Sequence, residues 1–281
     1  MSAASPGAPV EMGGSLVGRR TLLLLVTALS VVGVVGMRLL HHTGAGRRFD
    51  IAAGRDAATA LSDSHVEHAM SIVLDTVSVG SLLLVGGAFV VIALIWRRVD
   101  LAIAGAVLLG GSLATTELLK LRLHSPPEVP DRLRASYPSG HATVALALGL
   151  TVVLLAPPTL RTLAVAVAIA YAAIVGGALV FTAWHYPSDV GGGFFVATAW
   201  AAVAAQLVHS PAERPLPLRP LAALAAAVAV AALAAELGTP AAQAHDDLRA
   251  AVVAAVAGVV ALAAVCAATF AYAFSRPAGR R

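Results

Sequence analysis

The sequence predicts an all-α polytopic membrane helix bundle. Of its 281 residues, 59% are hydrophobic and only 12% are charged, whereas a soluble domain usually carries about 25% charged residues. The mean hydropathy of +0.85 points the same way, because a soluble chain of this length would lack the polar residues that cover its surface. Most of the surface is therefore expected to face lipid.

This composition excludes several classes of protein. Disulfide-bonded secreted scaffolds are excluded because the only cysteine, Cys266, lies within an apolar run and has no partner for an intramolecular bond. The isoelectric point near 9.8 would suggest a nucleic-acid partner for a soluble protein. In a membrane protein it reflects how basic residues are sorted across the bilayer. We therefore expect the bilayer as a partner and no nucleic acid; the sequence gives no indication of the oligomeric state.

A helix that crosses a bilayer needs about 20 apolar residues, and eight stretches of the chain approach or exceed this length. They are residues 21–40, 72–96, 101–119, 142–156, 160–184, 190–208, 218–237 and 248–274. The connections are short except at 41–71 and 120–141. Residues 1–18 are small and unpatterned and are expected to form a disordered cytoplasmic tail. The core is expected at 19–209 with six spans, and 210–281 is expected to add two C-terminal spans and a short basic tail.

Each stretch has its own justification. The first follows Arg19 and Arg20, is longer than the apolar part of a typical signal peptide and precedes no small-residue cleavage site, so we expect it to be retained as an anchor. The second and third contain glycines that allow close helix packing. The fourth is short, the fifth and sixth flank a polar turn, and the last two are rich in alanine.

The distribution of charge predicts the orientation. An even number of spans places both termini on one side of the membrane. If that side is cytoplasmic, the inner segments are rich in arginine and poor in acidic residues, and most acidic residues fall outside. This agrees with the positive-inside rule, and predicts a plasma (inner) membrane protein with both termini cytoplasmic.

Three polar segments are expected at the outer end of the spans. They are Lys120 at the end of the third span, residues 137–143 before the fourth, and residues 184–189 between the fifth and sixth. Charged and histidine side chains at membrane depth are unfavourable and usually functional. The convergence of three such segments on one membrane surface predicts a site there.

The first two segments have the chemistry of a phosphate site. Pro138-Ser139-Gly140 leads directly into an expected helix, so Ser139 can cap it while free backbone amides face outward. The amides and the helix dipole both favour an anion. Gly140 would allow a phosphate to approach the backbone closely, and Lys120 would supply a positive charge.

The third segment has the chemistry of an oriented nucleophile. His185 and Asp189 are four residues apart, and Pro187 interrupts the chain between them. A hydrogen bond from the imidazole of His185 to Asp189 would fix its tautomer and leave the other ring nitrogen free to attack. His141 supplies a second imidazole that could protonate a leaving group.

Pro138-Ser139-Gly140-His141, followed by His185-Tyr-Pro-Ser-Asp189, resembles the phosphatidic acid phosphatase type 2 / vanadium haloperoxidase superfamily over residues 21–208. The resemblance implies a six-helix fold with the site at one bilayer face and a phosphohistidine formed on His185. Asp189 would orient that histidine, and His141 would be the general acid. Lys120, Ser139 and Gly140 would hold phosphate. No metal and no other cofactor is implied.

The chain departs from this family pattern where two phosphate-binding arginines are expected. Pro127-Glu128 stands where the family has Arg-Pro, and Ala178-Leu179 stands where it has Ser-Arg. An arginine normally makes charge-assisted, often bidentate contacts to phosphate oxygens. We expect one of Arg122, Arg132 and Arg134, which lie in or beside the 120–141 connection, to supply this contact instead.

The other histidines give a weaker signal. His41-His42 and the pair His65 and His68 have spacings that a metal site could use, but no acidic or cysteine pattern completes a ligand set. Histidines are also ordinary in a loop near lipid headgroups, so no metal site is expected.

Taken together, these residues predict a membrane lipid phosphatase with its site on the extracytoplasmic side. The substrate would be a phosphomonoester or diphosphate on a lipid, and the family resemblance implies the phosphatidate, phosphatidylglycerophosphate or polyprenyl diphosphate type. One alternative is a phosphotransferase, in which an alcohol intercepts the same phosphohistidine. A second alternative, motivated by the departures at the arginine positions, is a catalytically silent lipid-binding or scaffold protein. A transporter is disfavoured because the span interiors contain almost no ionisable residues outside the site.

Overall fold

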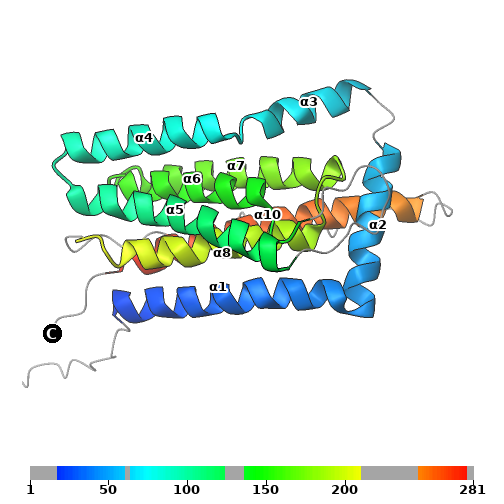
Figure 1. The fold of residues 1–281 in the computed structure, drawn as a ribbon, viewed down its shortest axis with the longest axis horizontal. Helices are drawn as coiled ribbons and strands as arrows, with labels where there is room; N and C mark the ends of the chain where they lie inside the picture. Colours follow the sequence, from blue (N-terminus) through cyan, green and yellow to red (C-terminus); the bar gives the residue numbers. More distant parts are fainter. Residues whose placement is uncertain (1–17, 61–63, 124–135, 210–245, 277–281) are drawn as a thin grey trace, which may run out of the picture.

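The computed structural model describes residues 18–60, 64–123, 136–209 and 246–276, and these ranges form helices and no strands (Figure 1). The helices are α1 (Arg19–His42), α2 (Gly44–Ala60), α3 (Ser64–Asp75), α4 (Val79–Ile95), α5 (Val99–Arg122), α6 (Gly140–Leu155), α7 (Arg161–Phe181), α8 (Pro187–Ala205) and α10 (Asp246–Phe274). The predicted all-α membrane bundle is confirmed.

Among the described residues, five helices are long and apolar enough to cross a membrane, namely α1, α5, α7, α8 and most of α10, and the bent pair of α3 and α4 would make a sixth span if counted as one. The predicted first, third, fifth, sixth and eighth spans correspond to the five single helices. The predicted fourth span is α6, a shorter apolar helix of 16 residues, which ends just before Pro157 and Pro158 because the residue before a proline disfavours helix. The predicted seventh span, 218–237, lies outside the described residues, as do residues 1–17 of the tail predicted at 1–18.

The predicted second span over 72–96 is a bent pair of helices, which qualifies as a membrane span only when the two are taken together. Two helices, α3 and α4, occupy this region and are bent by 41° relative to each other. The break has a local cause, because Ser78 forms a capping box that starts a new helix. The hydroxyl of Ser78 accepts a hydrogen bond from the backbone N–H of Ser81, and the hydroxyl of Ser81 accepts one from the N–H of Ser78.

The long connection predicted over 41–71 is largely helical. Helix α2 and most of α3 occupy it, and α2 crosses the end of the bundle at a steep angle to α1 (Figure 1). Thr43 separates α1 from α2. Its backbone is extended, and its hydroxyl accepts a hydrogen bond from the N–H of Gly46 at 3.0 Å, which is the usual way to cap the start of a helix.

Helix α8 forms the centre of the bundle and contacts α1, α5, α6 and α10 (Figure 1). Its small residues let neighbouring helices approach closely, as is common in membrane bundles. A Cβ added at Gly33 of α1 would lie 2.6 Å from the ring of Phe195, and one at Gly111 of α5 would lie 2.4 Å from the ring of Trp200. Glycine on the neighbouring helices therefore makes room for the aromatic side chains of α8.

Gly149 provides the same kind of contact between α6 and α7, and its replacement by leucine is expected to destabilise the protein by about 1–3 kcal/mol through overpacking. A Cβ at Gly149 would lie 2.7 Å from the Cβ and 2.8 Å from the Cα of Ala168, so relief requires movement of backbone. Thermal unfolding in detergent checks this. Gly110→Leu is the matched control because a Cβ there meets nothing within 4 Å; equal melting temperatures for the two variants would contradict the expectation.

One end of the bundle is held by arginines. The guanidinium of Arg19 donates to the carbonyl of Val208 at 3.1 Å and lies 5.0 Å from the centre of the Phe274 ring. Arg161 donates to the hydroxyl of Ser275 at 3.3 Å. The start of α1 and the end of α10 therefore lie at the same end of the bundle (Figure 1), as an even number of spans predicts.

Candidate functional site

The predicted site residues within the described part of the chain meet at the other end of the bundle. Lys120 lies in the last turn of α5, Ser139 and Gly140 start α6, and His185 and Asp189 flank the start of α8. A backbone hydrogen bond of 2.9 Å from the N–H of Ser139 to the carbonyl of Asp189 joins two of these segments directly. Segments that are distant in the sequence thus form one polar surface.

The start of α6 is capped as the sequence predicts. Ser139 is fully buried, its backbone is extended, and its hydroxyl accepts a hydrogen bond from the N–H of Ala142 at 3.4 Å. Its carbonyl accepts a hydrogen bond of 2.8 Å from the hydroxyl of Thr143. Thr116 of α5 donates to the same hydroxyl of Thr143 at 3.2 Å, so α5 and α6 are fixed to each other beside the helix start.

Lys120 lies against this helix start. A Cβ at Gly140 would come within 2.9 Å of the Lys120 Nζ, so glycine at this position leaves room for the ammonium group. The Nζ also pairs with Glu117 Oε1 at 2.7 Å, and the side chain of Glu117 is 55% exposed. An ion pair so open to solvent is weak. A cation and a helix N-terminus together are well suited to an anion.

His185 and Asp189 form a buried pair. His185 Nδ1 lies 3.5 Å from Asp189 Oδ2, and both side chains are almost inaccessible to solvent. The geometry is that of a close pair and not of a formed hydrogen bond, since the buried Nδ1 has no hydrogen-bond partner among the described residues. Contacts of catalytic groups are often long before substrate binds. Asp189 thus faces Nδ1 of His185 and not the other ring nitrogen, Nε2.

Asp189 is itself fixed by the start of α8. Its Oδ2 accepts a hydrogen bond from the backbone N–H of Tyr186 at 3.3 Å. Pro187 occupies the first turn of α8, where its fixed φ favours the helix and its missing N–H is not needed. The turn that carries His185 therefore continues into a helix whose first residues hold the carboxylate in place.

His141 reaches the same surface from α6. Its ring lies edge-on to the ring of Trp184, with 6.0 Å between the ring centres, and Trp184 directly precedes His185. The side chain of His141 is partly exposed, whereas that of His185 is buried. The two imidazoles therefore differ in their access to water.

The arginines that the sequence nominated are only partly described. Arg122 is exposed in the last turn of α5, and Arg132 and Arg134 lie outside the described residues. Sequence reasoning overlooked Arg38 of α1. Its guanidinium donates to the carbonyl of Leu123 at 3.3 Å and lies 5.6 Å from the centre of the Tyr137 ring. The only signal in the sequence was an arginine close to the end of an apolar run.

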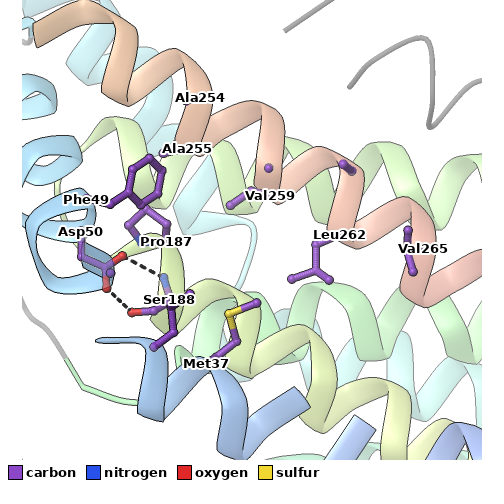
Figure 2. Close-up of a pocket in the computed structure, with 14 residues that line it drawn as sticks. Met37, Phe49, Asp50, Pro187, Ser188, Ala254, Ala255, Val259, Leu262 and Val265 are labelled. Atoms are coloured by element: carbon purple, nitrogen blue, oxygen red, sulfur yellow. Dashed lines mark hydrogen bonds between the residues drawn. The ribbon is translucent and has the colours of Figure 1, made fainter. Parts of the chain in front are cut away.

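A second buried cluster was also missed. Asp50 of α2 is only 3% exposed and accepts hydrogen bonds from the hydroxyl of Ser188 at 2.6 Å and from its backbone N–H at 3.3 Å (Figure 2). His41 Nδ1 lies 2.8 Å from the same carboxylate. Burial raises the pKa of Asp50 despite these contacts. The carboxylate of Asp50 is therefore bound at the N-terminus of α8, whereas the N-terminus of α6 lies beside the ammonium group of Lys120.

Asp50→Ala is expected to lower the free energy of unfolding by about 1–3 kcal/mol, because the N–H and hydroxyl of Ser188 lose a buried acceptor. Asp50→Asn is expected to be milder since an amide oxygen still accepts and burial already disfavours the charge. Thermal unfolding in detergent checks both, with the exposed Asp75→Ala as control. A loss for Asp50→Ala no greater than that for Asp75→Ala would contradict the role of Asp50.

Comparison with known proteins identifies the segment that carries the site. Residues 102–211 match the family model of the PAP2 superfamily, and the chain matches no curated protein and no solved structure in the corresponding comparisons. The match is narrower than the resemblance over 21–208, because α1 to α4 lie before it. It nevertheless contains every site residue named from the sequence: Lys120, Arg122, Arg132, Arg134, Ser139, Gly140, His141, His185 and Asp189. Residues 102–211, which carry the candidate site, are therefore similar to the PAP2 superfamily.

Proposed function

We propose that this protein is a membrane lipid phosphatase that hydrolyses a phosphomonoester or diphosphate through a phosphohistidine on His185. The match of residues 102–211 to the PAP2 superfamily supports a phosphatase acting on phosphate esters. The observation that carries the finer proposal is the position of Lys120 against the start of α6, at the same end of a membrane bundle as the buried pair of His185 and Asp189.

The proposed reaction has two steps. In the first, Nε2 of His185 attacks phosphorus, the bond between phosphorus and the leaving oxygen breaks, and His141 gives its proton to that oxygen. In the second, water attacks the phosphohistidine, His141 takes a proton from it, and the bond to Nε2 breaks to release inorganic phosphate. Asp189 stabilises the positive charge on the imidazole, and Lys120 and the amides of α6 stabilise charge on the phosphoryl oxygens.

The placement of the site favours a lipid substrate. A phosphate at the start of α6 would lie where helices of bilayer length end, so a lipid could keep its chain in the membrane while its phosphate enters the polar surface. Candidate substrates are phosphatidate, phosphatidylglycerophosphate and polyprenyl diphosphate. Arg19, Arg98 and Arg161 gather at the opposite end, and the positive-inside rule assigns that end to the cytoplasm. The proposed site is thus extracytoplasmic, in the plasma membrane.

Phosphate release by the purified protein in detergent tests this proposal. The substrates are phosphatidate, phosphatidylglycerophosphate, farnesyl diphosphate and the water-soluble ester p-nitrophenyl phosphate, each with and without chelator. We expect release from at least one lipid phosphate, inhibition by vanadate and no effect of chelator. Absence of release from all four would overturn the proposal and favour a silent lipid-binding protein. Transfer of phosphate to an added alcohol in preference to water would instead identify a phosphotransferase.

A further inference from the structure

An apolar cavity of about 370 Å³ lies between α1, α2, α8 and α10 (Figure 2). Its walls include Met37 of α1, Phe49 of α2, Pro187 of α8, and Val259, Leu262 and Val265 of α10. This volume is within the range of about 300–1,000 Å³ that small-molecule pockets occupy. Helix α10 lies beyond the part of the chain that matches the PAP2 superfamily, so the cavity is partly built by a segment outside that match.

The lining indicates the chemistry of the occupant. Among the described residues that line it, only Asp50 and Ser188 have polar side chains, and their polar atoms are engaged with each other, with Ser188 Oγ donating to Asp50 Oδ2 at 2.6 Å. A polar ligand would lose its hydration without gaining partners. A hydrocarbon would gain from the same walls.

The cavity is continuous with the lipid-facing surface. Leu40 and Val265, which both line it, are 47% and 54% exposed. They belong to α1 and α10, which are two of the helices long and apolar enough to cross a membrane. Exposed apolar residues on such helices face lipid chains, so a chain can pass from the bilayer into the cavity without meeting water.

The cavity also borders the turn that follows the candidate nucleophile, His185. Pro187 and Ser188 form part of its wall and lie in the sequence between His185 and Asp189. We propose that this cavity holds a hydrocarbon chain of the lipid phosphate while the phosphate lies at the start of α6. The proposal rests on the proposed function and deepens it: it gives α10 a part in selecting substrates with long chains.

Gly258→Phe is the variant that tests the cavity. Gly258 lines it, and a Cβ added there meets nothing within 4 Å, so the new ring fills open space instead of displacing a helix. Gly87→Phe is the matched control: Gly87 is likewise exposed and mid-helix with nothing within 4 Å, but it belongs to α4, which does not line the cavity.

The measurement is the ratio of kcat/KM for dioleoyl phosphatidate to that for dihexanoyl phosphatidate. We expect Gly258→Phe to lower this ratio about tenfold or more, because each buried methylene contributes to binding, and Gly87→Phe to leave it unchanged. An unchanged ratio for Gly258→Phe in an active enzyme overturns the cavity proposal alone. An equal fall in both kcat/KM values also overturns it, because that pattern reports structural damage.

A binding measurement separates this proposal from the proposed function. Phosphatidate with a photoreactive diazirine at the end of one acyl chain is irradiated with the intact protein in detergent, and labelled peptides are mapped. We expect labelling of residues 254–265 of α10 in the wild type and in Gly87→Phe, and loss of it in Gly258→Phe. Labelling without hydrolysis would overturn the proposed function and keep the cavity as a lipid-chain site. Absence of labelling, as expected if a second copy of the chain fills the cavity, would overturn the cavity proposal.

Discussion

His185→Ala is expected to lower kcat/KM for phosphate release by at least about 10³-fold, since loss of a nucleophile removes the entire covalent route. The imidazole is 6% exposed, and its Nδ1 has no hydrogen-bond partner among the described residues. Removal of the ring therefore breaks no hydrogen bond at Nδ1, although it separates Asp189 from its 3.5 Å neighbour. We expect the variant to fold, and its melting temperature in detergent checks this.

Asp189→Asn provides the graded comparison. Its amide oxygen can still accept the hydrogen bond from the N–H of Tyr186, so the start of α8 is preserved while the negative charge beside His185 is lost. We expect a smaller fall than for His185→Ala, of about 10²-fold, within the range typical of groups that assist proton transfer or orientation. Stopping the reaction in base and mapping phosphate to the peptide that holds His185 identifies the intermediate. Phosphate on another residue, or full activity of His185→Ala, would contradict the assignment.

The part of the site that could be predicted follows from the spacing of apolar stretches. Helices of bilayer length alternate in direction, so counting spans determines which connections share an end. This predicted that Lys120, Ser139 and His185 would lie together. The hydrogen bond between Ser139 and Asp189, and the approach of Lys120 to Gly140, are the structural outcome of that alternation.

The role of Gly140 illustrates a limit of such reasoning. The sequence indicated a glycine that admits a phosphate to the backbone, and the structure adds that the Lys120 ammonium lies 2.9 Å from where a Cβ would be. A sequence pattern identifies a position that must remain small. It does not identify the neighbour that needs the space, because that neighbour comes from another helix.

The features that were not predicted, the packed helix α2 and the break between α3 and α4, either have no local sequence signal or have one that mean hydropathy obscures. Asp50 is buried by Ser188, which is distant in the sequence, so nothing near it marked α2 as a packed helix. The break between α3 and α4 did carry a signal, the capping box of Ser78 and Ser81. It lies within an apolar run, where mean hydropathy predicts a continuous span and local capping decides otherwise.

Lys120→Ala is expected to lower kcat/KM by about 10²–10³-fold, the typical effect of removing one group that stabilises transition-state charge. Arg122 is exposed two residues after Lys120, in the same last turn of α5. If Arg122 supplies the arginine contact, Arg122→Ala is also expected to reduce activity. Full activity of Lys120→Ala in a folded protein would show that the start of α6 and the remaining cations hold phosphate without it.

Gly140→Ala tests the same contact without removing the charge. The added Cβ would lie 2.9 Å from the Lys120 Nζ, and the end of a lysine side chain moves easily, so the ammonium should shift while the helices stay in place. For Gly140→Ala we expect a fall of about tenfold in kcat/KM and little change in melting temperature. We expect the double variant, Gly140→Ala with Lys120→Ala, to have a kcat/KM no lower than that of Lys120→Ala alone, because both changes act on one interaction. Additive losses would contradict this. Glu117→Gln is the matched control and is expected to change anion binding in the opposite direction. It frees the Lys120 ammonium from its 2.7 Å ion pair with Glu117, so we expect tighter inhibition by vanadate.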